Sequence, residues 1–299
     1  MFNDNKKTIS AVIMCYKPTN KLVLNIDALL NQTVKLKNIL LICTDKDTLY
    51  TNLTNNFKNK LNDYSLHDFV KIKNITKDEF DHGRTRNYAT NFLDSEYVMF
   101  MTDDAVSLDE NLVYELIKPF GDEKVAVSYA KQIPYEDANF IEKTVRHFNY
   151  PNFDIEKSIL TKEKLGIKNY FLSNVCALYN MKIFREIGGF DENIPLNEDS
   201  IYSYKAIQRG YKVYYASNAK VIHSHSLSLI RQFIRNYNIG KTQKLKKEIF
   251  SNIKSENEGL KLFKYVAKKC INTYRFLDLL YFIFYCVVRY VGYILGKVL

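Results

Sequence analysis

The sequence predicts an α/β fold in which helices flank a sheet of mainly buried strands, followed by a C-terminal helical appendage. Three observations predict it. Short apolar runs alternate with segments of helical spacing, polar residues follow directly after several of these runs, and the pattern becomes helical and basic near Ser226. Such alternation is typical of a doubly wound sheet, which binds its ligands beyond the carboxyl ends of its strands.

The first half of the chain supplies four expected strands and three helices. Each strand is an apolar run bounded by polar residues, whereas the first helix repeats apolar residues at helical spacing. In order, we expect a strand at 9–15, a helix at 21–31, a strand at 38–43, a helix at 47–61, a strand at 69–75, a helix at 85–93 and a strand at 97–101.

The second half continues with both kinds of element and then changes character. We expect helices at 108–120, 140–148, 181–187 and 199–208, and strands at 125–129, 171–179, 212–215 and 219–223. The change of pattern near Ser226 divides the chain into a domain at 1–226, with halves 1–105 and 106–226, and a helical region at 227–299.

Composition limits the classes of partner. The formal net charge of +10 indicates an anionic partner, for which nucleic acid, a membrane surface and a phosphorylated substrate are all candidates. The five scattered cysteines and the polar N-terminus, which lacks a secretory signal, favour the cytoplasm. The sequence contains no GxGxxG and no Walker phosphate loop, which argues against a dinucleotide dehydrogenase or a P-loop NTPase.

Asp103 and Asp104 follow the apolar run 97–101 and a threonine. Carboxylates at a strand end suit a hard cation, because Mg²⁺ is usually held by one or two carboxylates and the phosphates of a substrate. The alternative is a solvated turn that caps the helix beginning near Ser107.

Glu198 and Asp199 follow a Gly-Gly-Phe-Asp segment and open an expected helix. A carboxylate at a helix N-terminus on the rim of a site can take a proton from an acceptor hydroxyl. With an ordinary pKa near 3.9, Asp199 would be ionised at neutral pH without any shift. The alternative is a helix cap or a favourable interaction with the helix dipole.

Two histidines, His223 and His225, close the strand expected at 219–223. If the strand continues, alternate residues share a face, so both imidazoles would point into one site and one of them would complete a metal shell. Two surface histidines at a strand end are the alternative.

The segment 81–87 combines His82, Arg86 and Asn87 with a glycine at a strand-to-helix turn. Arginine side chains and the free N–H groups of a helix N-terminus both suit a phosphate or another anion. A glycine turn with solvated arginines is the alternative.

Taken in order, these pieces resemble the family 2 glycosyltransferases of the GT-A fold, in particular the bacterial rhamnosyltransferases that build O-antigen and capsular polysaccharides. The resemblance spans roughly residues 10–241. It is carried by the stretches 80–87 (FDHGRTRN), 101–105 (MTDDA), 132–134 (QIP), 148–151 (FNYP), 171–176 (FLSNVC), 187–191 (IGGFD), 197–199 (NED) and 223–226 (HSHS).

The resemblance implies a Rossmann-like sheet that binds a nucleotide diphosphate sugar, with dTDP-rhamnose favoured, and a divalent metal, Mg²⁺ or Mn²⁺. Thr102 replaces the first aspartate of the family's DxD signature, so the main metal role passes to Asp104. Asp199 matches the general base of an inverting transfer. The remaining implied roles are metal support from Asp103, His223 and His225, donor contacts from Tyr16, Asp45, His82, Arg86, Asn87, Asp103 and Asp104, and acceptor contacts or support from Gln132, Asn174 and Glu198.

Other readings of the resemblance stay open. A UDP-hexose donor and a non-catalytic saccharide-binding or scaffold relative are the alternatives to rhamnosyl transfer. The sequence has no tryptophan and therefore lacks the QxxRW signature of processive synthases, which favours transfer of a single sugar. The acceptor would be a saccharide or a lipid-linked saccharide, and a nucleic-acid partner is not expected.

The C-terminal region combines a lysine-rich stretch at 241–269 with an apolar one at 276–295, which Asp278 and Arg289 interrupt. An arginine within a spanning helix costs roughly 2.5 to 3.5 kcal/mol, so spanning is not favoured. Two readings remain equal: a helix lying in a membrane surface at the cytoplasmic face, or a helix packed on the catalytic domain or on a second subunit of a homo-oligomer.

Overall fold

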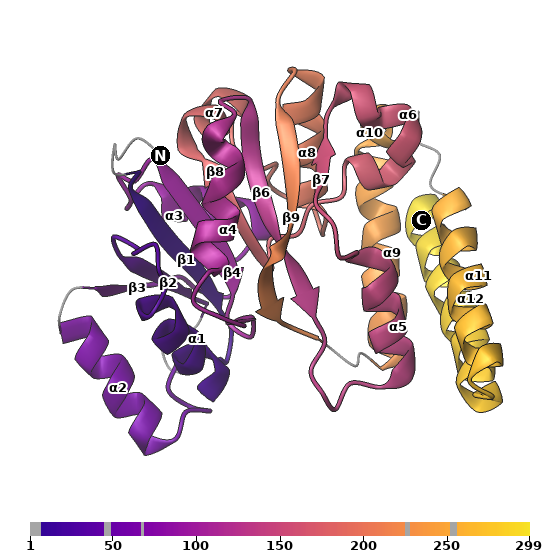
Figure 1. The fold of residues 1–299 in the computed structure, drawn as a ribbon, viewed down its shortest axis with the longest axis horizontal. Coiled ribbons are helices and arrows are strands. Elements are labelled where there is room, and N and C mark those ends of the chain that lie inside the picture. The colour runs from indigo at the N-terminus through magenta and orange to yellow at the C-terminus, as the bar shows by residue number, and fades with distance from the viewer. Residues whose placement is uncertain (1–6, 45–48, 67–68, 225–227, 252–255) are drawn as a thin grey trace.

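A computed structural model describes residues 7–44, 49–66, 69–224, 228–251 and 256–299. Within these residues a nine-stranded sheet has the order β3-β2-β1-β4-β8-β6-β9-β5, and β7 pairs separately with β9 (Figure 1). The strands are β1 Ile9–Cys15, β2 Ile39–Cys43, β3 Val70–Asn74, β4 Tyr97–Thr102, β5 Val106–Ser107, β6 Val125–Ile133, β7 Ile155–Lys157, β8 Cys176–Asn180 and β9 Lys212–Ile222.

Helices cover both faces of the sheet. The α1 and α4 helices pack in one apolar core with one set of strand side chains, and α3, α7 and α8 pack in a second core with the opposite set. The helices are α1 Asn20–Leu30, α2 Asn55–Leu66, α3 His82–Thr90, α4 Leu112–Ile117, α5 Phe140–Asn149, α6 Lys162–Leu165, α7 Met181–Ile187, α8 Glu198–Gln208, α9 Leu229–Leu245, α10 Lys247–Phe250, α11 Glu256–Asn272 and α12 Phe276–Val298.

Strand direction places several carboxyl ends at one edge of the sheet. The β1 strand runs parallel to β4, with Met14 paired in register to Thr102. The β8 strand is antiparallel to both β4 and β6, and β6 is parallel to β9 with Ile133 opposite Ile222. The strands β1, β4, β6 and β9 therefore point the same way and end together.

Several predicted elements differ from the structure, among them the helix expected at 108–120, of which only Leu112–Ile117 is α-helix. The helix expected at 47–61 is confirmed only from Asn55, where α2 begins, and residues 47–48 lie outside the described residues. Leu49 and Leu53 are buried in a turn, and their spacing of four imitates a helical face. The strand expected at 171–179 begins only at Cys176, because side chains of the preceding residues bond to the site described below. The strands expected at 212–215 and 219–223 are a single strand, β9.

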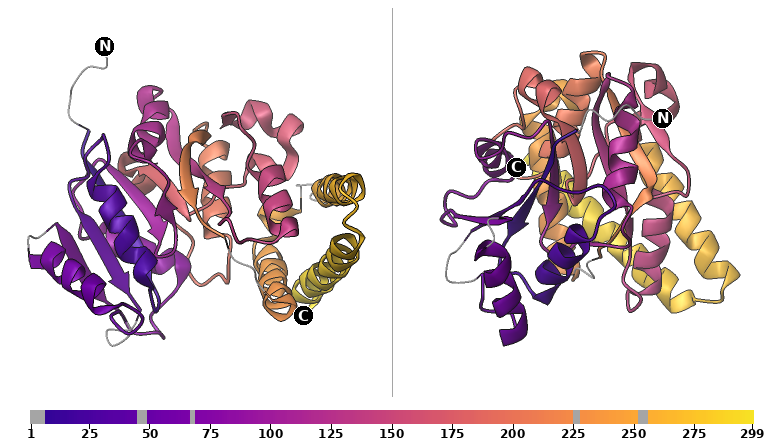
Figure 2. Two further views of the ribbon diagram at one scale, coloured as in Figure 1. Left: turned by 60° about the horizontal axis from the view of Figure 1, so that its bottom comes forward. Right: turned by 60° about the vertical axis from the view of Figure 1, so that its left-hand side comes forward.

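The last helices form a group at the edge of the molecule opposite β3 (Figures 1 and 2). The α9 and α12 helices touch backbone to backbone, since a Cβ added at Gly296 would lie 1.9 Å from the carbonyl oxygen of Tyr237. The α11 and α12 helices form a hairpin, and a small core that includes Ile141, Val266 and Phe282 joins this hairpin to α5.

Candidate active site

The common strand edge brings Asp103 and Asp104 beside the end of β1. Asp103 Oδ2 accepts a hydrogen bond of 3.0 Å from the backbone N–H of Tyr16, which follows β1. Asp104 Oδ1 lies 3.5 Å from Nε2 of His223, the residue that follows β9. The aspartate pair is thus not a plain solvated turn, because each of its carboxylates faces the end of another strand.

The hydrogen bonds of Gln132 fix how His223 presents its ring. Gln132 is buried on β6, and its Oε1 is bonded by the guanidinium of Arg146 and lies 3.0 Å from His223 Nδ1. Arginine can only donate, so the amide oxygen faces it, and His223 must then donate from Nδ1. With the proton on Nδ1, the Nε2 atom of a neutral imidazole is unprotonated, and it is this atom that faces Asp104.

The second carboxylate pair lies at the start of α8 and is held by Asn174. The Asn174 side chain donates to Glu198 Oε1 at 3.2 Å, and its backbone N–H donates to Asp199 Oδ2 at 3.3 Å. Asp199 Oδ1 also accepts 2.7 Å from the backbone N–H of Ser200. Tyr179 donates to Asn174 Oδ1 at 2.6 Å, which fixes the amide in this orientation.

The two carboxylates differ in charge because their surroundings differ. Burial and, after it, the negative charge of Glu198 raise the pKa of Asp199, and against the two backbone N–H donors they bring it to about 7. For Glu198, burial would also raise the pKa, but the charges of Arg86 and His82 and the amide of Asn174 leave it below its ordinary value. The expectation that Asp199 has an ordinary pKa is therefore wrong.

Arg86 does not extend into solvent as the anion-binding prediction required. Its side chain is 4% exposed, and its guanidinium donates to Glu198 Oε1 at 2.8 Å and to the carbonyl of His82 at 2.9 Å. Burial lowers the pKa of His82 below its ordinary value. The Arg86 guanidinium therefore binds the carboxylate pair. Arg84, the exposed arginine of the segment, contacts Asn193 and Glu192.

Asn87 binds the loop that leads to the carboxylate pair. Its amide oxygen accepts 2.9 Å from the N–H of Phe190, and its amide nitrogen donates to the carbonyl of Phe190 and to Glu192, each at 3.0 Å. Gly83 is equally close to this loop, since an added Cβ would lie 2.0 Å from the carbonyl oxygen of Asp191. The start of α3 is therefore packed directly onto the 188–192 loop.

The segment 173–175 joins the two halves of the site. Gln132 donates to Ser173 Oγ at 2.8 Å, Asn174 bonds to both carboxylates of α8, and the carbonyl of Val175 accepts 3.3 Å from the N–H of Thr102. Three consecutive residues thus connect the β6–β9 end, the carboxylate pair at the start of α8 and the aspartate pair after β4. They form no strand here because their polar groups make these contacts.

The other predicted site residues have different outcomes. Tyr16 stands at the sheet edge with 52% of its surface exposed, so its ring is open to a ligand. Asp45 and His225 lie outside the described residues. The sequence analysis did not single out Arg146, Tyr179 or Tyr135, whose hydroxyl donates to the carbonyl of Asp104 at 3.1 Å. The position of Tyr135 directly after the QIP stretch was the one local signal for it.

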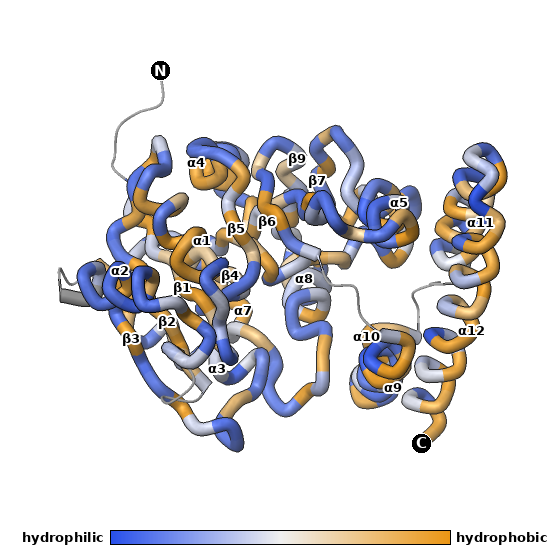
Figure 3. Tube along the Cα trace, turned by 90° about the horizontal axis from the view of Figure 1, so that it is seen from below, coloured by the Kyte–Doolittle hydropathy of each residue, from blue (hydrophilic) through white to orange (hydrophobic). Residues whose placement is uncertain are grey.

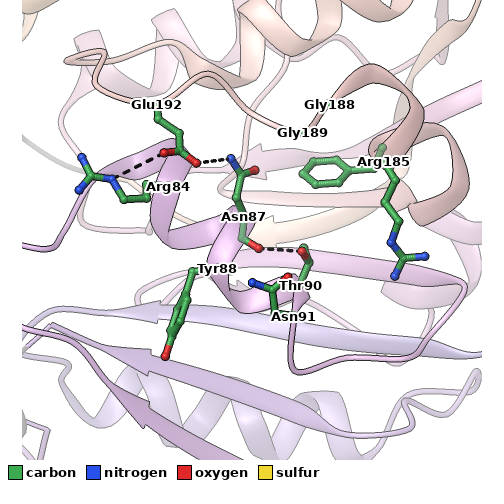
Figure 4. Close-up of a pocket in the computed structure, with 10 residues that line it drawn as sticks. Arg84, Asn87, Tyr88, Thr90, Asn91, Arg185, Gly188, Gly189 and Glu192 are labelled. Atoms are coloured by element: carbon green, nitrogen blue, oxygen red, sulfur yellow. Dashed lines mark hydrogen bonds and ion pairs between the residues drawn. The ribbon is translucent and has the colours of Figure 1, made fainter.

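A shallow pocket beside α3 contains the contacts of Glu192 with Arg84 and Asn87 but neither carboxylate pair (Figure 4). It has a volume of about 450 Å³ and is lined by residues of α3, α7 and the 188–192 loop, among them Arg84, Asn87 and Arg185. Neither Asp104 nor Asp199 lines it. We therefore place the chemistry at the strand edge and not in this pocket.

Asp104 and His223 fit a divalent cation. A carboxylate oxygen and a neutral imidazole nitrogen are both ligands of such ions, and two ligands each about 2.1 Å from one ion lie roughly 3.0 to 3.4 Å apart, close to the separation found here. Within the described parts of the chain, no group of three or more His, Cys, Asp or Glu side chains is arranged to hold a metal. The predicted four-residue shell is thus reduced, among described residues, to this pair with Asp103 beside it.

Comparisons with known proteins agree on one family. Residues 10–188 match the family model described as glycosyl transferase family 2. The chain is 35% identical over 216 residues to the O-antigen chain rhamnosyltransferase RfbN of Salmonella typhimurium, covering 72% of this chain and 66% of that protein. It is 38% identical over 167 residues to the O-antigen chain rhamnosyltransferase WbaN of Salmonella anatum, covering 56% and 53%. The matches span about two thirds of the first relative and about half of the second.

Solved structures share the fold at low identity. The mannosyltransferase PcManGT from Pyrobaculum calidifontis, in complex with GDP-Man and Mn²⁺, superimposes with a TM-score of 0.63 at 12% identity, over 97% of this chain and 87% of that one. Residues 1–349 of S. aureus TarS, in complex with UDP-GlcNAc, give a TM-score of 0.57 at 13% identity, over 88% and 72%. These likenesses confirm the predicted fold class, a GT-A sheet flanked by helices with a C-terminal helical part.

Proposed function

The chain belongs to glycosyl transferase family 2, and from this premise we propose that it is an inverting glycosyltransferase that moves a single rhamnose from a nucleotide diphosphate to a saccharide acceptor in cell-surface polysaccharide synthesis. Support for rhamnose and for O-antigen comes from the printed functions of the two Salmonella relatives. We propose dTDP-rhamnose as the donor, a lipid-linked saccharide as the acceptor and the cytoplasmic face of the cell membrane as the place. Residues 1–226 would form the catalytic domain and 227–299 its helical appendage.

The observation that carries the proposal is the position of Asp199. Two backbone N–H groups, from Asn174 and Ser200, hold its carboxylate, while burial and the charge of Glu198 bring its pKa to about 7. A carboxylate with a raised pKa is a stronger base than an ordinary one and is still largely ionised just above neutrality. Asp199 would take the proton of the acceptor hydroxyl as that oxygen attacks the anomeric carbon.

The other carboxylate of the pair has a positioning role. Glu198 stays anionic because Arg86 donates to it, and Asn174 bonds both to Glu198 and to Asp199. This chain of contacts fixes the start of α8 on α3. We propose that Arg86 acts on the reaction through Glu198, and that Asn87 acts by holding the 188–192 loop, in place of direct donor contacts.

The donor diphosphate would bind at the edge where β1, β4 and β9 end. Asp104 and His223 would hold a divalent cation, Mn²⁺ or Mg²⁺, with Asp103 in support and with His225 as a proposed further ligand. Such an ion neutralises the charge that develops on the leaving diphosphate. Tyr16 offers an exposed ring to the base or ribose of the nucleotide, and Asp45 and His82 are the further proposed donor contacts.

Release of nucleoside diphosphate from a panel of donors tests this proposal. Purified full-length protein would receive dTDP-rhamnose, UDP-hexoses or GDP-mannose, each with Mg²⁺ or Mn²⁺ and with an extract of lipid-linked saccharides. We expect release of dTDP that requires both acceptor and metal and is lost in Asp199→Asn. Release of UDP alone would show that the transferred sugar is a hexose and not rhamnose. No release from any donor would refute the proposed enzymatic activity and favour a saccharide-binding role.

A further inference from the structure

The net charge of the chain resides entirely in its C-terminal helices. Residues 227–299 contain 14 of the 43 Lys and Arg residues and 4 of the 33 Asp and Glu residues, a formal charge of +10. Residues 1–226 contain 29 of each and are formally neutral. A donor diphosphate bound in the sheet domain therefore does not account for the positive charge, and the helical part requires an anionic partner of its own.

The α12 helix has an apolar face that the described part of the chain leaves uncovered. Its side chains recur at intervals of three and four residues and are between 37% and 84% exposed: Leu277, Leu280, Phe284, Val287, Val291 and Ile294. We call these six residues the apolar face. Ile283 and Tyr290 on one side of them and Tyr281 on the other are exposed and apolar as well. Figure 3 shows α12 as mostly hydrophobic along its length.

The charges that interrupt α12 in the sequence do not interrupt its apolar face. Arg289 Nε donates to Asn236 of α9 at 3.4 Å, and its second nitrogen donates to Tyr285 at 3.3 Å. Asp278 forms an ion pair of 2.6 Å with Arg275 just before the helix. The apolar face is therefore continuous, and it lies away from the side on which Gly292 and Gly296 meet α9.

The neighbouring helix α11 presents lysines. Lys261, Lys264 and Lys268 are three and four residues apart on one exposed face, which we call the basic face. The α11 and α12 helices lie side by side in one hairpin, which therefore carries both an exposed basic face and an exposed apolar face (Figures 1 and 2). Helices of this composition bind in the plane of a membrane, with the apolar side in the acyl boundary and lysines at the lipid phosphates.

We propose that the α11–α12 hairpin docks the protein on an anionic lipid bilayer, with the apolar face inserted and the basic face on the headgroups. This deepens the proposed function, because it supplies the surface from which a lipid-linked acceptor would be reached. The hairpin lies in the plane of the membrane, although α12 is long and apolar enough to span one. If α12 spanned the membrane, α9 would have to enter it as well, because the two helices are in contact at three glycines. The α9 helix is also bonded to the sheet domain, since the backbone N–H of Leu196 donates to Thr242 Oγ1 at 3.3 Å.

A second copy of the chain suits this surface less well. The apolar face has the spacing of a coiled-coil seam, but such seams are flanked by charged residues that determine which partner is bound. Here the flanking positions Ile283 and Tyr290 are apolar. Pairing two copies would also bring together two regions of charge +10. A wide apolar face beside excess positive charge matches a bilayer with anionic lipid.

Co-sedimentation of the full-length protein with vesicles tests the proposal. We expect binding to phosphatidylcholine vesicles that contain phosphatidylglycerol, weaker binding to phosphatidylcholine alone, and loss of binding at high salt. The triple variant Lys261→Gln, Lys264→Gln and Lys268→Gln should bind roughly 100-fold more weakly at low salt, about fivefold for each lysine. Its matched control, Lys71→Gln, Lys73→Gln and Lys77→Gln, makes the same charge change near β3 and should bind like the wild type.

A second triple variant tests the apolar face. Leu280→Ser, Phe284→Ser and Val287→Ser should abolish vesicle binding, because the buried apolar area is lost while the charge is unchanged. Circular dichroism would show that the helices are retained. Unchanged vesicle binding by this variant, or equal loss in the two lysine variants, would overturn the proposal. So would a wild-type dimer that this variant dissociates without losing vesicle binding, because the face would then be a subunit interface.

Two further measurements keep this proposal separate from the proposed function. Alkaline carbonate should release the bound protein, and resistance to it would mean that α12 spans the bilayer. The vesicle assay needs no turnover, so a protein that docks but transfers no sugar would refute the proposed function alone. Full transfer to a water-soluble acceptor by a protein that never binds vesicles would refute docking alone.

Discussion

Replacing Glu198 by glutamine should move the pH dependence of catalysis to lower pH. The anionic Glu198 side chain contributes to the raised pKa of Asp199. The two carboxylates are close, because one residue, Asn174, donates a hydrogen bond to each of them. For two charges about 7 Å apart at an effective dielectric constant near 20, the repulsion is on the order of 2 kcal/mol, or between one and two pKa units. Glutamine removes this repulsion and still accepts a bond from Arg86.

The assay is kcat/KM for nucleoside diphosphate release as a function of pH. A general base works when deprotonated, so wild-type activity should rise with pH through a value near 7, the pKa of Asp199. In Glu198→Gln the rise should begin between one and two pH units lower, with some loss of stability because Arg86 keeps a buried charge. Glu163→Gln, an exposed site on α6, is the matched control. A rise at the wild-type pH in a folded Glu198→Gln protein would refute the link between these carboxylates.

Three further variants test separate parts of the structure. Asp199→Asn should lose transfer but keep donor binding, and it should raise Tm at pH 8 more than at pH 4. The pKa of Asp199 is raised to about 7 in the folded protein, so its contribution to stability is present at low pH and is lost as pH rises through 7. Equal Tm changes at the two pH values would contradict this. Asp104→Asn should weaken Mn²⁺-dependent donor binding measured by calorimetry, with metal-free binding unchanged, and an equal loss in both conditions would remove the metal role. Gly296→Ala should destabilise the protein by about 1 to 3 kcal/mol in urea unfolding, because the added Cβ would lie 1.9 Å from the Tyr237 carbonyl oxygen. The control Gly259→Ala on α11 meets nothing within 4 Å and should be neutral or stabilising. Similar values for the two variants would contradict the close contact of α9 and α12.

The sequence predicted the sheet well because its signals are local. The parallel strands β1, β2 and β4 are buried apolar runs, and polar residues mark the end of β4 at Thr102 and Asp103. The errors arose where apolar residues are buried without regular structure. Leu49 and Leu53 imitate a helix in a turn, and the segment before Cys176 has strand-like composition but makes side-chain bonds to the site.

The sequence indicated which residues come together at the strand edge but not their electrostatics. Asp104 and His223 were both singled out, and the structure brings them within 3.5 Å. The pKa of Asp199 and the burial of Arg86 could not be read from the sequence, because both depend on α3 packing against the start of α8, more than a hundred positions away. Arg146 was missed because its contact with Gln132 depends on how α5 packs against the end of β6, which the helical pattern of 140–148 does not indicate.

The three residues Ser173, Asn174 and Val175 carry a consequence for how this enzyme can change. Through them Asp199, the proposed base, and the aspartate pair after β4 are bonded to one short stretch of backbone, so an insertion or deletion there would displace both at once. The end of β1 is not tied to this stretch by any of the three bonds. In the proposed function, substitutions around the Tyr16 side chain would therefore alter which nucleotide is bound while the geometry around Asp199 stays intact, and donor choice would be the more freely exchangeable property of the molecule.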